Sequence, residues 1–147
     1  MCLITEQKKP KRVKEDMIVY KTGYAHYNSN GNLEEVNAVF NFFNYLPHQL
    51  YETKFSFINP ASREAIGYDD EVNLAYGNRN ERSTKNLLVV AKGFHSAKNI
   101  ERLKQSSNHC GHKFECIIPK GSLIYEDKTG LIVSDKIIIK KELLTKQ

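Results

Sequence analysis

Short apolar runs separated by turn residues follow one another along most of this chain, and this pattern predicts strands. Residues 17–24 are rich in β-branched and aromatic side chains, which favours a strand. Residues 28–32 contain an Asn-Gly pair, a strong hairpin signal. Residues 50–58 alternate polar and apolar side chains, and residues 87–91 form a continuous apolar run. Both patterns predict further strands.

The clearest strand signal lies in residues 114–141. Short apolar runs occupy residues 116–118, 123–125, 132–133 and 137–139, and turn residues separate them. Each run is too short for a helix and is rich in isoleucine. The segment therefore predicts two or three consecutive strands.

Residues 33–43 fit two patterns. Leu33, Val36, Val39, Phe40 and Phe43 have helical spacing, whereas the alternation of asparagine with aromatic residues over the following positions has a period of two. We weigh this stretch slightly toward a strand.

One helix is predicted, over residues 97–104. Ser96 is a suitable N-cap, and Ala97, Ile100 and Leu103 form an apolar stripe behind it. The predicted fold class is therefore α+β, a single domain with a mainly antiparallel sheet of six to eight strands and one main helix. The domain covers residues 16–147, after an irregular basic lead-in over residues 1–15.

Residues 59–85 are polar and interrupted by proline and glycine. A loop of this length is unusual inside a compact domain. We expect a functional loop or a mobile excursion, with a short helical turn near residues 62–65.

Composition indicates an ordinary globular protein of 147 residues, with 40% hydrophobic and 27% charged residues. No apolar run is long enough for a transmembrane helix, and no signal peptide is evident. We therefore expect a cytoplasmic protein without membrane contact.

The net charge is +5, and part of this excess lies in the basic N-terminal segment. A solvated terminus is the simpler interpretation, and nucleic acid bound by this segment is the alternative.

A metal site is conceivable at residues 109–116, where His109, Cys110, His112 and Cys116 supply nitrogen and sulfur donors. The spacing does not match a zinc knuckle, and Cys116 begins a predicted strand, where a thiol acts as a small apolar side chain. We therefore predict no metal, no cofactor and reduced cysteines.

Residues 93–96 are the best candidate for a ligand site, because they lie between a buried strand and the start of the predicted helix. Free N–H groups and the helix dipole favour phosphate there, and His95 could donate to it or act as an acid or base. The alternative is that Ser96 only caps the helix and His95 only packs. Ligand-binding residues predicted from this reasoning are Lys21, His95, Ser96, Ser134 and Lys136.

No complete catalytic motif occurs, so catalytic residues are not predicted and enzyme activity stays open. The aromatic residues of the first half could stack nucleic-acid bases, but packing inside the fold is the simpler interpretation. It stays open whether they face a core or a partner.

The chain resembles a group of small, mostly uncharacterised proteins encoded by phages and prophages of gut bacteria. The resemblance rests on short segments in the same order along nearly the whole chain: MCL at residues 1–3, EDMIVYK at 15–21, LYET at 50–53, GFHS at 93–96 and CIIPKGS at 116–122. It implies a setting, the cytoplasm of an infected host.

A weaker resemblance is to the ADP-ribosyltransferase-like fold, through the early Tyr20-Lys21 strand, the Gly93–Ser96 segment and the Pro119–Gly121 strand pair. That pattern has a late catalytic glutamate, and no glutamate of this chain lies in a matching motif; Glu115 and Glu126 are stand-ins for it without motif support. The serine-threonine-serine strand of that pattern is absent.

We therefore expect a small phage-type protein that binds a phosphate-bearing nucleotide-like molecule and interferes with host nucleotide signalling. Two alternatives stay open: an ADP-ribosyltransferase-like enzyme, and a structural or virion-associated protein that forms a homo-oligomer or holds nucleic acid.

Overall fold

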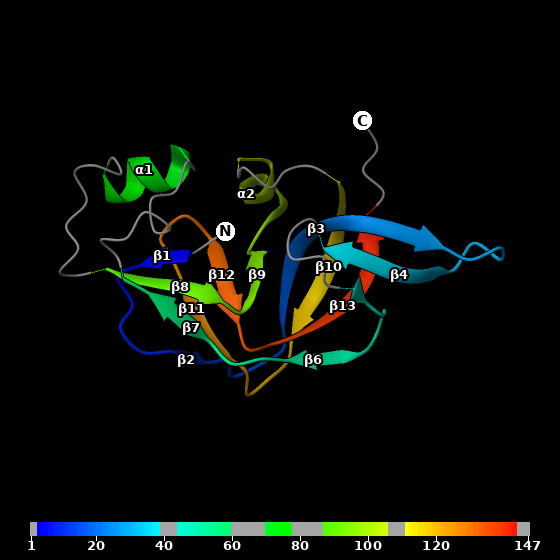
Figure 1. Cartoon of the computed structure of the whole chain (residues 1–147), viewed down its shortest axis with the longest axis horizontal. Helices are drawn as coiled ribbons and strands as arrows, with labels where there is room; N and C mark the ends of the chain where they lie inside the picture. The colour runs from blue at the N-terminus through cyan, green and yellow to red at the C-terminus, as the bar shows by residue number, and fades with distance from the viewer. Residues whose placement is uncertain (1–2, 39–43, 60–69, 78–86, 106–110, 144–147) are drawn as a thin grey trace.

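Antiparallel sheets make up almost the whole structure (Figure 1), a computed structural model that describes residues 3–38, 44–59, 70–77, 87–105 and 111–143. A ten-stranded sheet carries most of the chain and a three-stranded sheet lies beside it. The three-stranded sheet has the order β1 (Leu3–Thr5), β8 (Leu88–Lys92), β7 (Ser56–Ile58).

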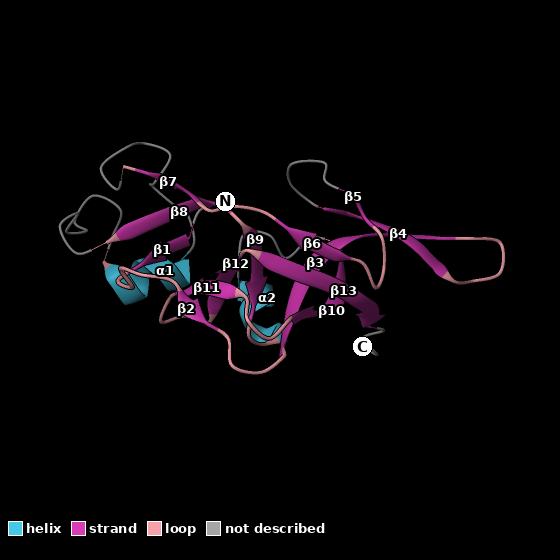
Figure 2. Ribbon diagram, turned by 90° about the horizontal axis from the view of Figure 1, so that it is seen from below, coloured by secondary structure: helices cyan, strands magenta, loops and turns pink. Residues whose placement is uncertain are grey.

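The ten-stranded sheet has a main path of eight strands, in the order β2 (Lys11–Arg12), β11 (Leu123–Glu126), β12 (Leu131–Ser134), β9 (Phe94–Ala97), β3 (Met17–Tyr27), β10 (His112–Ile118), β13 (Lys136–Leu143), β6 (Leu50–Glu52). Off this path, β4 (Leu33–Ala38) pairs with β3, and β5 (Asn44–Tyr45) pairs with β4. The β3–β4 hairpin projects beyond the other strands in both views (Figures 1 and 2).

The predicted α+β class with one main helix is wrong. Strands account for 57% of the structure and helices for 8%. The two helices described are short, α1 (Asp70–Tyr76) and α2 (Ile100–Gln105). The sheet also has more strands than the six to eight predicted.

The helix predicted to start at Ala97 begins three residues later, at Ile100. Ala97 instead ends β9, where it pairs with Leu131 of β12 and with Tyr20 of β3. Pairing on both sides buries Ala97 completely, and this tertiary environment outweighs its helix propensity. The N-cap is Asn99, whose Oδ1 accepts a hydrogen bond of 2.9 Å from the N–H of Arg102.

The irregular lead-in predicted over residues 1–15 is also wrong, because it contains β1 and β2. Leu3, Ile4 and Thr5 are buried, and β1 pairs with β8. Their lysine-rich surroundings concealed a short strand that completes the smaller sheet.

Most of the remaining strand predictions are confirmed where the structure describes them. The single strand predicted over residues 50–58 is wrong, because this segment is divided into β6 and β7, which belong to different sheets. Asn28 Oδ1 accepts hydrogen bonds of 3.0 Å from the N–H groups of Asn30 and Asn32, and Gly31 has a φ of 79°. These contacts close the predicted hairpin, with β4 as its second strand. The runs in residues 114–141 form β10 to β13. Of the polar segment 59–85, α1 is described, whereas the helical turn predicted near 62–65 lies outside the described residues.

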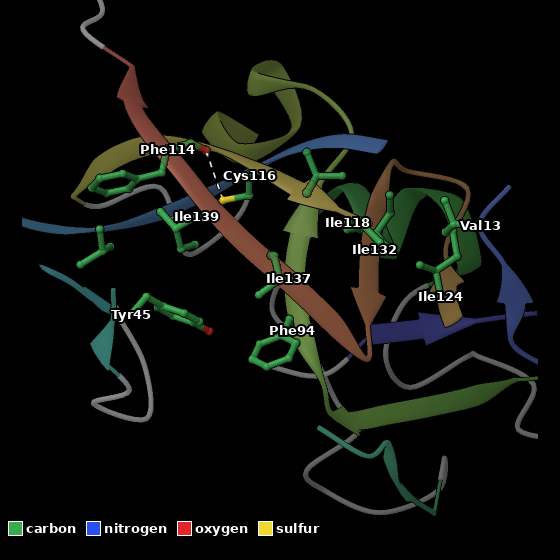
Figure 3. Close-up of a cluster of buried hydrophobic side chains, with 12 residues drawn as sticks. Val13, Tyr45, Phe94, Phe114, Cys116, Ile118, Ile124, Ile132, Ile137 and Ile139 are labelled. Atoms are coloured by element: carbon green, nitrogen blue, oxygen red, sulfur yellow. Dashed lines mark hydrogen bonds between the residues drawn. The ribbon is translucent and has the colours of Figure 1, made fainter. Parts of the chain in front are cut away.

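Alternation along the central strands separates two hydrophobic cores. Phe114, Cys116 and Ile118 of β10 face the first core, together with Phe94 of β9 and Val19 of β3 (Figure 3). The second core lies on the other side of β9 and β12, where it contains Ala97, Leu131 and Val133, and Tyr20 packs against its edge. A third, smaller core joins α1 to the three-stranded sheet through Val72, Ile4 and Val89. Neighbouring residues on the central strands therefore have different surroundings.

Candidate functional site

Four of the five predicted ligand-binding residues come together in the sheet. Lys21 lies on β3, His95 and Ser96 lie on the adjacent β9, and Ser134 ends β12, directly opposite Phe94. Lys136 does not join them within the sheet, since it opens β13 opposite Glu52, and three strands separate β13 from β12 in the sheet order.

The physical reason given for this site does not hold. Residues 94–96 belong to β9 and not to a loop before a helix. α2 starts four residues after Ser96 and has six residues. Free N–H groups and a helix dipole are therefore not aimed at residues 93–96, and the expected phosphate cradle is not formed there.

Lys21 points to the buried side of the sheet. It pairs with Phe114 of the first core, its ammonium donates a hydrogen bond to the main-chain oxygen of His95, and its Nζ lies 5.8 Å from the centroid of the Tyr45 ring. Burial lowers the pKa of Lys21 from its ordinary value. These contacts tie β3 to β9 from inside the core, which is a structural role.

His95 lies on the opposite side of β9 from Phe94 and is uncharged at neutral pH. Burial, helped by the charge of Lys21, lowers its pKa to about 3. Its Nδ1 lies 3.1 Å from the main-chain oxygen of Gly93, and only a protonated Nδ1 can donate to that oxygen. The main chain of Val90 also lies close to the ring, and Nε2 is buried. Because this pKa is far below neutrality, His95 is not the near-neutral acid or base expected from the sequence.

Ser96 and Ser134 both face the first core. Ser134 is 0% exposed, and its hydroxyl lies 3.5 Å from the main-chain oxygen of Phe94. Ser96 is buried, and its hydroxyl has no hydrogen-bond partner in the part of the chain that the structure describes. Lys21, Ser96 and Ser134 thus lie together, but on the side of the sheet that the first core covers.

On the other side of the sheet, β9 and β12 face the second core, and β3 and β10 present a partly exposed surface. Tyr20 of β3 lies directly opposite Glu115 of β10 and, on its other side, opposite Ala97 of β9. This row runs from the second core outward: Ala97 is buried, Tyr20 is partly buried, and the Glu115 side chain is 16% exposed. We refer to the following six residues of two adjacent strands as the open face: Ile18, Tyr20, Thr22, Lys113, Glu115 and Ile117.

Glu115 is the acidic group of the open face. One of its carboxylate oxygens lies 3.9 Å from Nζ of Lys140 on β13, a distance at which the attraction is weak for a partly exposed pair. The carboxylate therefore keeps lone pairs for a ligand. A carboxylate, a phenol and flanking ammonium groups are the kinds of group that bind the hydroxyl, ring and phosphate parts of a nucleotide.

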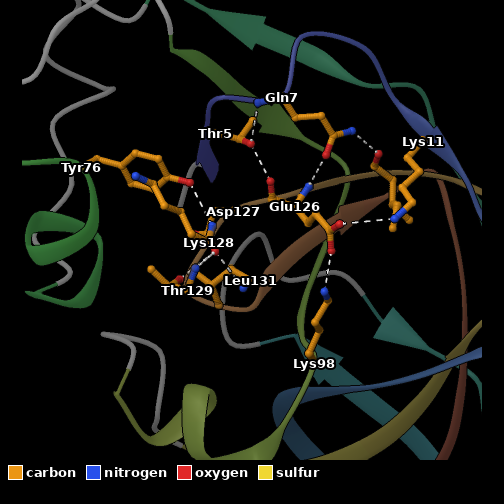
Figure 4. Close-up of polar contacts among 11 residues, drawn as sticks. Thr5, Gln7, Lys11, Tyr76, Lys98, Glu126, Asp127, Lys128, Thr129 and Leu131 are labelled. Carbon is orange, nitrogen blue, oxygen red and sulfur yellow. Dashed lines mark hydrogen bonds and ion pairs between the residues drawn. The ribbon is translucent and has the colours of Figure 1, made fainter.

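Glu126, the other late glutamate, has a structural role at a distant edge of the sheet (Figure 4). Its carboxylate pairs with Lys98 at 2.7 Å and with Lys11 at 3.7 Å. Its main-chain oxygen accepts from the Thr5 hydroxyl, and its N–H donates to the Gln7 side chain at 3.1 Å. Glu126 holds β1 and β2 onto β11, and the structure separates it from Glu115, which the sequence did not.

The turn after β11 is also structural. Asp127 Oδ1 accepts hydrogen bonds from the N–H and hydroxyl of Thr129 and from the N–H of Leu131, at 2.7–3.0 Å. Burial raises the pKa of Asp127. The Lys128 N–H donates to the Tyr76 hydroxyl at 2.9 Å, so this turn connects α1 to the larger sheet.

The metal-like segment is divided in the structure. Cys116 is a buried free thiol of the first core, and burial raises its pKa to about 12. His112 instead pairs with Glu142, with Nδ1 and Oε1 2.7 Å apart. His109 and Cys110 lie outside the described residues. No group of three or more metal-binding side chains occurs within the described ranges.

The basic N-terminal segment is partly fixed to the sheet. Lys11 pairs with Glu126, and Arg12 Nη1 donates to the main-chain oxygen of Gly121 at 2.7 Å. Lys120 and Ser122 form the same turn, in which the Ser122 hydroxyl donates to the main-chain oxygen of Pro119 at 2.6 Å.

Sequence reasoning missed the open face because this surface depends on the register of two strands, β3 and β10. The alternation of Phe114, Glu115 and Cys116 does indicate that Glu115 points away from a core. The sequence does not show that Tyr20 lies opposite Glu115, because β3 and β10 are distant in the chain.

Comparisons with known proteins leave this site without a precedent: no family profile, curated protein or solved structure matches the chain. No helix within the described ranges is long and apolar enough to cross a membrane.

Proposed function

We propose that the protein binds a phosphate-bearing nucleotide derivative on the open face, without turnover. The observation that carries the proposal is the register of β3, which places Tyr20 between Ala97 of β9 and Glu115 of β10. Three segments of the sequence resemblance, at residues 15–21, 93–96 and 116–122, thereby fall on neighbouring strands.

Each part of a nucleotide has a complementary group on this face. A carboxylate such as Glu115 can accept hydrogen bonds from ribose hydroxyls. The partly exposed Tyr20 ring lies directly opposite Glu115 and offers an apolar surface beside the ribose. Lys113 and Lys140 flank the carboxylate and supply positive charge for phosphate.

The sequence resemblance supplies the setting for this proposal. A phage-encoded protein in the host cytoplasm would use such binding to sequester a nucleotide signal. Of the residues proposed from the sequence, Lys21, Ser96 and Ser134 would support the strands from the side of the first core. His95 lies on the other side of β9, the side of the open face.

A thermal-shift titration with AMP tests the proposal. Millimolar AMP should raise the melting temperature of the wild-type protein, since a ligand that binds only the folded state stabilises it. Glu115→Gln should remove the shift, whereas Glu126→Gln should keep it, because Glu126 lies at another edge of the sheet. Equal shifts for all three proteins, or no shift for the wild type, would contradict the proposal.

ADP-ribosyl transfer is the second candidate, favoured by the position of Glu115 opposite Tyr20. A carboxylate beside the ribose would stabilise positive charge at its anomeric carbon as nicotinamide leaves NAD. The test is nicotinamide release from NAD by the purified protein, measured by chromatography. Release that Glu115→Gln abolishes and Glu126→Gln preserves would replace the binding proposal with this one. The absence of release would exclude it.

A further inference from the structure

The open face consists of three rows with different chemistry, arranged along the strands. Ile18 lies opposite Ile117, Tyr20 lies opposite Glu115, and Thr22 lies opposite Lys113. Successive rows on one side of a sheet are about 7 Å apart. A ligand that lies parallel to β3 and β10 therefore meets an aliphatic row, then a phenol with a carboxylate, then a hydroxyl with an ammonium.

The aliphatic row is unusually exposed for its composition. Ile18 is 51% exposed, and the row continues across Ile138 of β13 to the exposed Leu50 of β6. Asp16 comes directly before β3, where its Oδ1 accepts a hydrogen bond of 2.8 Å from the Lys120 N–H, and a carboxylate near this end would repel phosphate. This end of the open face suits an uncharged, planar group.

The opposite end suits an anion. Within the described residues, the Thr22 hydroxyl and the Lys113 ammonium have no protein hydrogen-bond partner, and both side chains are partly exposed. A hydroxyl and an ammonium side by side can donate several hydrogen bonds to phosphate oxygens. Glu115 lies between the two ends, where a ribose would be.

We infer that the ligand is a 5′-phosphorylated nucleoside that lies along β3 and β10, with its base on Ile18 and Ile117 and its phosphate at Thr22 and Lys113. This inference rests on the proposed function and adds the direction in which the ligand lies along the two strands. The order base, ribose, phosphate in the ligand matches the order aliphatic, carboxylate, ammonium along the strands.

Calorimetric titration of each variant with three probes, AMP, adenosine and ribose 5-phosphate, tests the direction. Lys113→Gln should lower the affinity for AMP and for ribose 5-phosphate about tenfold and leave the affinity for adenosine within twofold. Ile18→Ser should lower the affinity for AMP and for adenosine several-fold and leave the affinity for ribose 5-phosphate unchanged. Lys92→Gln and Leu74→Ser serve as controls, because both residues are exposed and lie outside the ten-stranded sheet. They should change nothing.

The possible results separate the two claims. If AMP binds and Glu115→Gln removes binding, but Lys113→Gln weakens adenosine as much as AMP, the direction is wrong and the proposed function stands. The same holds if Ile18→Ser weakens ribose 5-phosphate. If the folded wild type binds none of the three probes at millimolar concentration, both claims are overturned.

Discussion

Glu115 of β10 lies directly opposite Tyr20 of β3, on the side of the sheet that the first core leaves open. This pair lies where the second core ends, so that Tyr20 packs against that core and the Glu115 side chain is partly exposed. A carboxylate held beside an aromatic ring on adjacent strands has a fixed geometry, because the main-chain ladder sets both positions. The predictions below start from this pair.

Glu115→Gln should remove nucleotide binding and leave the fold intact. The carboxylate forms one weak ion pair, to Lys140 at 3.9 Å, so its loss should change the free energy of unfolding by less than about 1 kcal/mol. The affinity for AMP should fall about tenfold or more, since hydrogen bonds to a charged group contribute about 1.5–3 kcal/mol. Calorimetry and urea unfolding measure the two quantities. Glu34→Gln, on the exposed surface of β4, should change neither, and weakened binding there would argue against a local effect.

Acid should destabilise the protein through His95. Its pKa is about 3 in the folded state and near 6.5 in the unfolded chain, so below pH 6.5 the unfolded state binds a proton that the folded state does not. Stability is then lost progressively as the pH falls from 6.5 toward 3, by about 2 kcal/mol at pH 5.

Urea unfolding at several pH values should reveal this loss in the wild type and a flatter dependence in His95→Gln. His26→Gln provides the control, since His26 is exposed and should keep the wild-type slope. Identical slopes for the wild type and His95→Gln would show that His95 is not held neutral by burial.

Gly93→Ala should destabilise the protein strongly. Gly93 has a φ of 150°, and a Cβ there would lie 2.2 Å from Cγ1 of Val133 and 3.2 Å from the Phe55 ring. We expect a loss of about 3 kcal/mol from overpacking and backbone strain together. Gly31→Ala is the matched control: its φ of 79° is also positive, but a Cβ meets nothing within 4 Å, so the loss should be about 1 kcal/mol. Equal losses in urea unfolding would mean that the contact with Val133 is unimportant.

Thr5→Val should show that the N-terminal segment is part of the fold. The Thr5 hydroxyl donates to the main-chain oxygen of Glu126 and accepts from the N–H of Gln7, and the residue is buried. Valine keeps the shape and removes both bonds, which should cost about 1–3 kcal/mol in urea unfolding. If stability were unchanged, the attachment of β1 to β11 would not contribute to the fold.

Local sequence signals were sufficient for most of the strands. Asn28 and Gly31 form the turn that their residue types favour. The isoleucine-rich runs after Phe114 form separate short strands, since proline and glycine lie between the first of them. Ala97 shows where local signals fail. Its helical spacing with Ile100 and Leu103 was correct as a pattern, but neighbours from distant parts of the chain make it the end of a strand.

The candidate site depended on information that the sequence does not carry. The sequence identified Lys21, His95 and Ser96 as neighbours in function, and they are neighbours in space. It did not indicate on which side of the sheet each side chain lies, and a shift of one residue in register would exchange the two sides. Nor did it indicate that burial lowers the pKa of His95 far below the near-neutral value on which its acid or base role depended.

Methyl NMR during an AMP titration tests the central claim most directly, because neighbouring isoleucines report on the two sides of one sheet. Ile18 and Ile117 belong to the open face, whereas Ile118 and Ile137 belong to the first core. AMP should shift the methyl signals of Ile18 and Ile117 and leave those of Ile118 and Ile137 in place. If no methyl signal moves at millimolar AMP, or if the core isoleucines move while Ile18 and Ile117 do not, the open face is not the ligand site.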